Sequence, residues 1–138
     1  MSVDPINPSD LGPASGFSHG QLGREGGRVL FVAGQIGVVD SPTPVVANEA
    51  SMVAQFGEAL RRLLRVVEDA QGGPADIGRM TVFVTDMDLY RRSRKALGSV
   101  WKARMHPHYP AMALVEVKSL VDPQALVEIE ATAVIGGK

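Results

Sequence analysis

One long segment repeats its hydrophobic positions at the period of an α-helix. From Asn48 onward, apolar residues recur at steps of three and four, and charged residues fall largely between them. The apolar positions are Val53, Phe56, Leu60, Leu63, Leu64, Val67 and Ala70. This spacing places them on one helical face. Asn48 is a suitable N-cap, and Gly72-Gly73-Pro74 is a sequence at which a helix ends. The pattern therefore predicts an amphipathic helix between them.

A thinner apolar stripe predicts a second helix over residues 89–105. Asp86 or Asp88 is placed to cap its N-terminus, because a short acidic side chain accepts hydrogen bonds from free backbone N–H groups there. The stripe consists of Leu89, Ala96, Leu97, Val100 and Trp101.

Several segments carry the pattern of β-strands. Residues 79–85 alternate, which places Met80, Val82 and Val84 on one face of a half-buried strand. Residues 28–34, 111–117 and 126–135 are also strand-like in composition. Gly26-Gly27 indicates a hairpin that joins residues 28–34 to a short strand around 17–22.

The order strand, strand, helix, strand, helix, strand, strand predicts an α+β fold. A helix between two strands usually makes a right-handed crossover to a parallel neighbour, which gives a mixed sheet with both helices on one face. We expect a single domain over residues 1–138, with the Pro- and Gly-rich residues 1–16 as an N-terminal arm and a loop around Pro42 and Pro44. The sheet face without helices carries apolar residues, which predicts self-association.

Composition narrows the possible functions. The net charge of −1 argues against a nucleic-acid or anionic-membrane binder, and the absence of cysteine excludes thiol chemistry. The chain begins without a signal-peptide pattern and has no apolar run long enough to span a bilayer, so we expect a soluble cytoplasmic protein. The mean hydropathy of +0.06 is high for a small domain, so part of the apolar surface is expected to face another subunit.

Two polar clusters have ordinary structural explanations. Arg91-Arg92 and Arg94-Lys95 spread around the start of the second helix as a solvated face does, and no aromatic platform for nucleic acid accompanies them. His106 and His108 lack a third ligand at a spacing typical of zinc sites, so a loop is the favoured interpretation and acid–base chemistry is an alternative.

Three glutamates lie in predicted strands. Glu128 and Glu130 are two residues apart and so share one face of the last strand, and Glu116 shares a face with Met112. A carboxylate among apolar strand residues is a candidate for proton transfer. Pairing with a basic side chain, or exposure at a sheet edge, is the alternative.

Several motifs together resemble the reactive intermediate (enamine/imine) deaminase family, which is RidA-like and also known as YjgF or endoribonuclease L-PSP. The resemblance is collinear from about residue 12 to residue 135. The motifs are Gly12-Pro13, Leu30-Phe31-Val32-Ala33-Gly34-Gln35-Ile36-Gly37, Ala70-Gln71-Gly72-Gly73, Thr81-Val82-Phe83-Val84-Thr85-Asp86-Met87, Tyr109-Pro110-Ala111-Met112, Val115-Glu116-Val117 and Leu126-Val127-Glu128-Ile129-Glu130-Ala131.

The resemblance implies a chorismate-mutase-like two-layer fold that assembles as a homotrimeric barrel, with small-molecule clefts between subunits. It implies no cofactor and no metal. The best-known members hydrolyse 2-imino acids to 2-keto acids and ammonia. They hold the substrate carboxylate with an arginine that corresponds to Met112 here, and Ala14 and Ala33 also stand where the family has polar residues. A thioether cannot replace the bidentate pairing of guanidinium with a carboxylate, so standard 2-imino acid turnover is expected to be poor.

The family pattern also indicates which residues form the site. Glu130 matches the glutamate placed near the attacking water and is the expected catalytic residue. The expected substrate-binding residues are Ala14, Phe17, Ala33, Gly34, Gln35, Tyr109, Met112 and Glu116. The leading hypothesis is hydrolysis of an atypical small imine, enamine or carbonyl compound, with Arg104, His106 or His108 as substitute polar groups. A non-catalytic metabolite-binding trimer, and a ribonuclease or translation inhibitor, are the alternatives.

Overall fold

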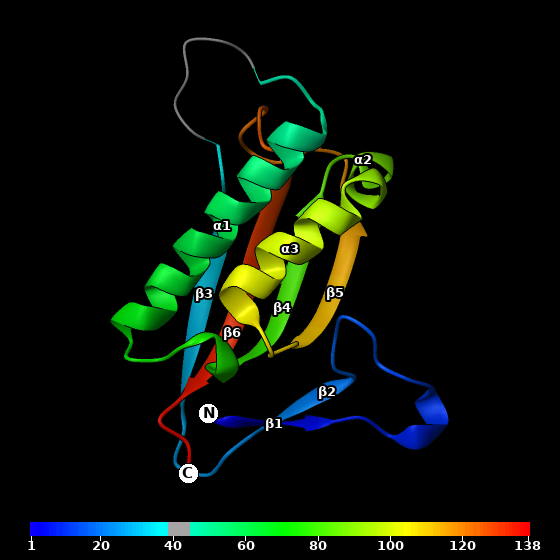
Figure 1. The fold of residues 1–138 in the computed structure, drawn as a ribbon. Coiled ribbons are helices and arrows are strands. Elements are labelled where there is room, and N and C mark those ends of the chain that lie inside the picture. The colour runs from blue at the N-terminus through cyan, green and yellow to red at the C-terminus, as the bar shows by residue number, and fades with distance from the viewer. Residues whose placement is uncertain (39–44) are drawn as a thin grey trace.

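The computed structural model describes residues 1–38 and 45–138. Its centre is a four-stranded mixed sheet with the strand order β3-β6-β4-β5 (Figure 1). The strands are β3 (Arg28–Ile36), β4 (Ile77–Val84), β5 (Ala111–Glu116) and β6 (Val127–Ile135). β4 and β5 are parallel, and β6 is antiparallel to both β3 and β4. The predicted mixed sheet is therefore confirmed, whereas the loop predicted around Pro42 and Pro44 lies outside the described residues.

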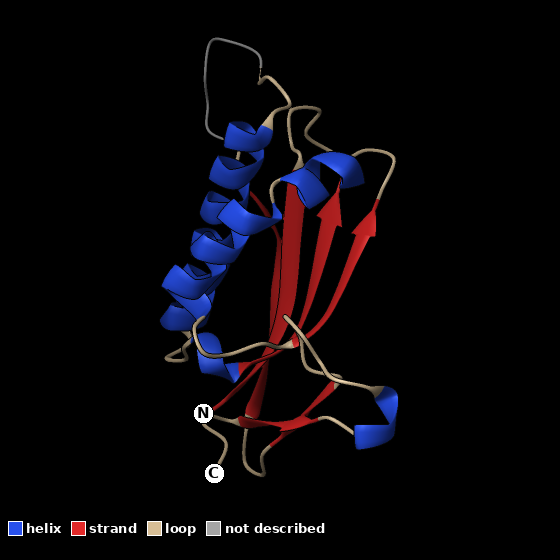
Figure 2. Ribbon diagram, turned by 45° about the vertical axis from the view of Figure 1, so that its right-hand side comes forward, coloured by secondary structure: helices blue, strands red, loops and turns tan. Residues whose placement is uncertain are grey.

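Helix α1 (Glu49–Asp69) covers one face of this sheet, as its apolar period predicts. Asn48 is the N-cap: its side chain accepts a hydrogen bond from the backbone N–H of Ser51, and the Ser51 hydroxyl accepts one from the backbone N–H of Asn48. Met52, Leu60 and Leu63 are fully buried along the inner face. Figure 2 shows the α-helices on one side of the main sheet, and none of them lies on the opposite side; a separate short helix lies beside the small sheet.

The second predicted helix is broken in two. α2 (Met87–Arg92) and α3 (Arg94–Met105) meet at Ser93, whose hydroxyl donates to the backbone oxygen of Leu89 at 2.8 Å. A serine that bonds back to the preceding turn bends a helix in this way. Asp86 caps α2 by accepting from the backbone N–H of Leu89, as predicted. The expected stripe is wrong at Ala96, which is exposed.

Alternate residues of each strand point to opposite faces of the sheet, so one face is buried and the other is not. Met80, Val82 and Val84 of β4 are fully buried beneath the helices. Ile129 and Ala133 of β6 are also fully buried on that face. The intervening residues of both strands point to the uncovered face.

The N-terminal segment is not the irregular arm that its prolines and glycines predict. β1 (Val3–Ile6) pairs antiparallel with β2 (Gly20–Gly23) in a separate two-stranded sheet, and Val3 is 1% exposed. Short 3-10 turns occur at Ser9–Leu11 and Pro74–Asp76. The prolines and glycines of this segment predicted a loop. Pro5 is nevertheless compatible with β1, because a proline is tolerated in an edge strand.

The predicted hairpin at Gly26-Gly27 is also wrong. β2 pairs with β1, and β3 pairs with β6 instead of β2. Gly26 has a φ of +81°, which turns the chain from one sheet into the other. A Cβ atom on Gly27 would lie 2.2 Å from Cγ1 of Val134, so close packing on β6 requires glycine there.

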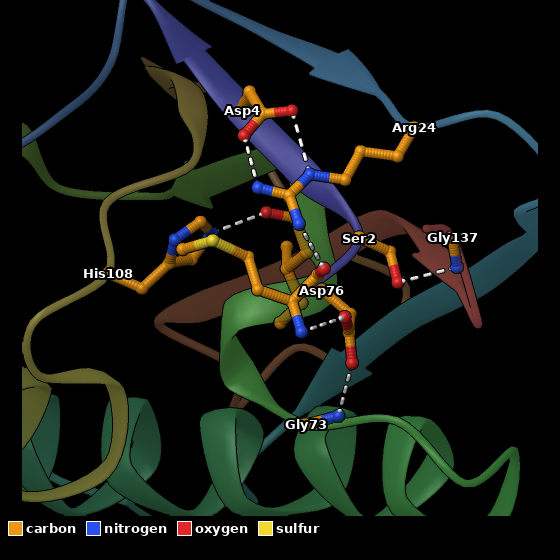
Figure 3. A network of polar contacts seen from close by, with 9 residues as sticks. Ser2, Asp4, Arg24, Gly73, Asp76, His108 and Gly137 are labelled. Atoms are coloured by element: carbon orange, nitrogen blue, oxygen red, sulfur yellow. Dashed lines mark hydrogen bonds and ion pairs between the residues drawn. The ribbon is translucent and has the colours of Figure 1, made fainter.

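Polar contacts stabilise the small sheet and join it to the end of the main fold (Figure 3). Arg24 forms a bidentate ion pair with Asp4 inside the small sheet. The Ser2 hydroxyl accepts from the backbone N–H of Gly137 at 2.8 Å, and this bond connects the start of the chain to the end of β6. Asp76 accepts from the backbone N–H of Gly73 within its own turn. In the part of the chain that the structure describes, none of the helices has both the length and the apolar character needed to cross a membrane.

Candidate functional site

The largest contribution to a candidate site comes from one face of α3. Arg94, Leu97, Gly98, Trp101 and Lys102 follow one another at steps of three and one, which places them together on the helix surface. They line a cavity of about 320 Å³ between α3 and β5, hereafter the α3 cavity. From the sequence, Arg94 was expected on a solvated face and Leu97 and Trp101 in the apolar stripe, and none of the five residues was expected at the site.

The opposite wall of the α3 cavity contains two of the residues expected at the site. Met112 of β5 and Tyr109, just before β5, both line it. The Tyr109 ring stacks on the Trp101 indole, with centroids 5.9 Å apart and an angle of 10° between the planes. The cavity therefore has an aromatic and thioether wall, and Met112 provides no charged group in it.

Polar groups of α2 and α3 also reach the α3 cavity. Arg94 and Lys102 are exposed, and neither forms an ion pair with an acidic side chain among the described residues. Burial raises the pKa of the Tyr90 phenol, and the positive charge of Arg94 opposes that rise. The Trp101 indole N–H is buried without a hydrogen-bond partner in the described structure.

Ala14 and Phe17 lie in a neighbouring cavity of about 330 Å³. Tyr109 lines this cavity as well, and thus stands between the two spaces. The Tyr109 backbone oxygen accepts hydrogen bonds from the Ser18 hydroxyl and from Nε2 of Gln21, which fixes the chain at this point. Of the expected binding residues, Ala14, Phe17, Tyr109 and Met112 are therefore close together.

Ala33, Gly34 and Gln35 lie elsewhere, at an irregularity in β3. The pairing of β3 with β6 shifts register between Val32 and Gln35, so Ala33 and Gly34 have no cross-strand partner. A Cβ atom on Gly34 would lie 2.6 Å from Oε1 of Glu128. The bulge therefore brings glycine backbone directly against a carboxylate, and any larger side chain at position 34 would displace that carboxylate.

Glu130 shares a face with Glu128 but is more exposed. It stands opposite Thr81 of β4 on the uncovered face of the sheet. Glu130 was the glutamate expected at the site, whereas Glu128 is the glutamate whose carboxyl group lies against Gly34. Spacing in the sequence could not distinguish the two, because residues two apart always share a face.

Glu116 has a structural role in this chain. Its Oε1 accepts a hydrogen bond from the backbone N–H of Met87 at 2.9 Å, at the start of α2. A carboxylate at a helix N-terminus stabilises the free N–H groups of the first turn. Glu116 and Met112 share the β5 strand, yet Glu116 is not among the residues that line the α3 cavity.

The histidines differ in their surroundings. His108 is buried, and its Nε2 lies 2.6 Å from the backbone oxygen of Ile77, a contact visible in Figure 3. His106 is exposed. No group of three or more histidine, aspartate or glutamate side chains suited to a metal ion occurs within residues 1–38 and 45–138. His108 thus ties the loop before β5 to β4.

Within one chain the expected site is divided. β3 and β5 are opposite edges of the sheet, separated by three strand spacings of about 4.8 Å each, or roughly 14 Å. Met112 faces the helices in register with Met80, while Glu128 faces the uncovered side. A single small molecule cannot contact both groups in the same chain.

The comparisons with known proteins agree with this fold and chain length. Residues 8–135 match the family model described as endoribonuclease L-PSP. A RutC family protein from Haemophilus influenzae is 34% identical over 108 residues, which are 78% of this chain and 80% of that protein. The crystal structure of the Rid family protein YyfB from Yersinia pestis has a TM-score of 0.78 and 29% identity, covering 96% of this chain and 98% of that one.

A second solved structure has the same fold. The YjgF gene product from E. coli has a TM-score of 0.64 and 28% identity, with 94% of this chain and 93% of that chain covered. The two-layer fold with both helices on one face of a mixed sheet is therefore the one predicted. On this evidence the chain belongs to the endoribonuclease L-PSP family, and it is a RidA-like protein.

Proposed function

We propose that the protein hydrolyses the C=N bond of an imine, or of an enamine through its imine tautomer, in a cleft between copies of the chain. Family membership supports this class of chemistry. The observation that carries the proposal is the Glu128 carboxylate against the β3 bulge at Gly34, with Glu130 on the same face of β6. Carboxylates next to unpaired backbone groups are suited to holding and deprotonating water.

The proposed reaction consumes one water and releases ammonia. The carboxylate takes a proton from water as the oxygen adds to the imine carbon, and the carboxylic acid so formed passes that proton to the nitrogen, which gives a carbinolamine. The carboxylate then carries the hydroxyl proton of the carbinolamine to its nitrogen as the C=O bond forms and the C–N bond breaks, so ammonia leaves and the carboxylate is restored. The resemblance assigns the carboxylate to Glu130, and the position next to Gly34 favours Glu128, so both are candidates.

The proposed cleft needs a second copy of the chain, because one chain separates its two halves by the width of the sheet. A trimer that places the β3–β6 side of one copy beside β5 of the next would unite the carboxylates with Met112 and Tyr109. It would also cover the uncovered sheet face, where Phe31 is 80% exposed and Val29 is 57% exposed. Exposed apolar side chains gathered on one face favour association.

The proposed substrate is an atypical small imine or carbonyl compound. A 2-imino acid would find the Met112 thioether where a guanidinium could pair with its carboxylate. The loss of one charge-assisted hydrogen bond, about 1.5–3 kcal/mol, weakens binding roughly tenfold or more. Poor turnover of standard 2-imino acids is therefore part of the proposal.

The test is a coupled assay in which an amine oxidase generates a panel of imines that are not 2-imino acids, and the protein accelerates release of ammonia. An amino-acid oxidase supplies standard 2-imino acids for comparison. Glu128→Gln and Glu130→Gln are compared with wild type, and Glu68→Gln, an exposed residue of α1, is the control. We expect one of the two β6 variants to lose at least about a hundredfold in kcat, consistent with loss of a general base.

Turnover that is unaffected by both β6 substitutions would contradict the assignment of the base. Absence of turnover across the panel, together with ligand-dependent stabilisation, would support a binding protein instead. Rapid turnover of standard 2-imino acids by wild type would contradict the argument from Met112. In that case Met112→Arg should bring no gain.

A further inference from the structure

We infer that the α3 cavity binds an amphipathic organic carboxylate, whose anion is anchored by Arg94 at one end of the cavity or by Lys102 at the other. The ligand class is a compact aromatic or branched apolar body bearing one carboxylate. This inference names the ligand class of the proposed site, and to that extent it rests on the proposed function. Binding is nevertheless measurable without turnover.

The helix pattern places both cations at the cavity. Arg94, Gly98 and Lys102 are each four residues apart, so they lie along one face of α3. Arg94 and Lys102 are about 12 Å apart along the helix axis, from eight residues at 1.5 Å each. Arg94 and Lys102 therefore lie at opposite ends of the wall that α3 forms along the cavity, hereafter the α3 wall. The described residues that line the cavity include no acidic side chain.

The middle of the α3 wall is open and apolar. A Cβ atom added to Gly98 would meet nothing within 4 Å, so the glycine leaves space at this point of the helix. Leu97, Trp101 and Met112 provide the apolar surface around it. A volume of about 320 Å³ is at the lower end of the range for small-molecule sites, which fits a compact ligand.

Trp101 provides a hydrogen-bond donor that is not satisfied by any described residue. Its side chain is 8% exposed, and the indole N–H has no partner among the described residues. An unpaired buried donor costs free energy, and a ligand oxygen would remove that cost. Tyr90 also lines the cavity, and its phenol is protonated at neutral pH like any ordinary tyrosine, so the hydroxyl can donate to an anion.

These features compensate for the methionine at position 112. An anion that cannot pair with a residue of β5 can instead pair with the guanidinium or ammonium group of α3 across the cavity. The apolar body then contacts Met112 and Tyr109. The ligand that follows is larger and less polar than a short 2-imino acid.

The experiment uses phenylacetate as the probe and phenylacetamide as its neutral counterpart. Trp101 is the only tryptophan in the chain, so fluorescence excited at about 295 nm reports on the cavity wall itself. The increase in Tm with ligand is the second readout. We expect a saturable fluorescence change with phenylacetate at a Kd at least about tenfold lower than that for phenylacetamide.

Variants then locate the site. Arg94→Gln with Lys102→Gln should weaken phenylacetate binding about tenfold or more, while Lys95→Gln, a neighbouring exposed residue of α3 that does not line the cavity, should leave it unchanged. Gly98→Leu should fill the open space and abolish binding, and its far-ultraviolet circular dichroism and Tm show whether it folds. If Gly98→Leu does not fold, Gly98→Val serves the same purpose.

Three results would overturn the inference: no saturable signal and no Tm increase with wild type, equal affinity for the amide, or binding that survives both the double substitution and the filled cavity. These outcomes are separable from failure of the proposed function. Absence of imine turnover together with intact phenylacetate binding would refute the proposed hydrolase activity and leave the binding site unaffected. Imine turnover that is unchanged when Arg94 and Lys102 are substituted would refute only the role of these two residues in binding the anion.

Discussion

The two faces of the central sheet are built from the same strands but have opposite surroundings. On the helix side, Met80, Val82 and Ile129 are completely buried. On the other side, Phe31 is 80% exposed and Glu130 is also exposed. Alternation along a strand decides only that two faces differ, and the elements that pack above each face decide what each becomes.

The difference also concerns function. The helix side holds the α3 cavity, with cations contributed by α3, while the uncovered side holds the carboxylates of β6 beside the β3 bulge. The helix side is covered by α1, α2 and α3 of the same chain, whereas the described residues place no helix over the β3–β6 carboxylates. Substitutions on the helix side are therefore expected to change the stability of one chain, and substitutions on the uncovered side are expected to change the proposed assembly.

The largest expected effect is on assembly. Phe31→Asp should convert the proposed trimer to a monomer, because the substitution places a charge where an apolar ring would be buried by another copy. Light scattering coupled to size exclusion should show the mass falling about threefold. Val121→Asp, in an exposed loop, is the matched control and should remain assembled. A monomeric wild type would show that the face is open in solution.

The next effect separates the two faces within one chain. In the Phe31→Asp background, Ile129→Ala should lower the free energy of unfolding by about 2–5 kcal/mol, since it removes fully buried methyl groups. Val29→Ala, on the uncovered face, should cost less than about 0.5 kcal/mol. Urea unfolding measures both. Equal losses would mean that the uncovered face is packed even in the monomer.

A smaller effect concerns glycines on the helix side. A Cβ atom on Gly37 would lie 1.9 Å from the backbone oxygen of Gln55 in α1, so Gly37→Ala should lower the free energy of unfolding by about 1–3 kcal/mol. Gly98→Ala meets open space and should raise it by up to about 1 kcal/mol through helix propensity. Thermal unfolding of the two variants distinguishes the close contact from the cavity. A loss of stability in Gly98→Ala would show that the α3 cavity is filled.

The smallest expected effect concerns the exposed ion pair between Arg24 and Asp4. The Arg24 guanidinium hydrogen-bonds to Asp4 and holds the pKa of that carboxyl below its usual value. The pair therefore contributes stability above the ordinary aspartate pKa, and this contribution is lost as pH falls through the lowered pKa. Asp4→Asn should lower Tm slightly at neutral pH, and the two proteins should converge in strong acid. A difference that persists there would mean that Asp4 acts through packing.

Local periodicity predicted most of the secondary structure. The long helix, its Asn48 cap and the alternation of Met80, Val82 and Val84 depend on neighbouring residues, and each is confirmed. β1 and the break at Ser93 were missed. The pairing of β1 with β2 spans many residues, and the break depends on a side-chain hydrogen bond that no apolar pattern records.

The sequence by itself determined the family, the long helix and the strand faces, because these follow from motifs and from spacing along the chain. Only the tertiary structure decided which glutamate lies against Gly34 and that Arg94 and Lys102 border one cavity with Met112. Those relations join residues of different elements across the sheet and the helix layer. Their distances are set by packing, and spacing in a linear sequence carries no information about them.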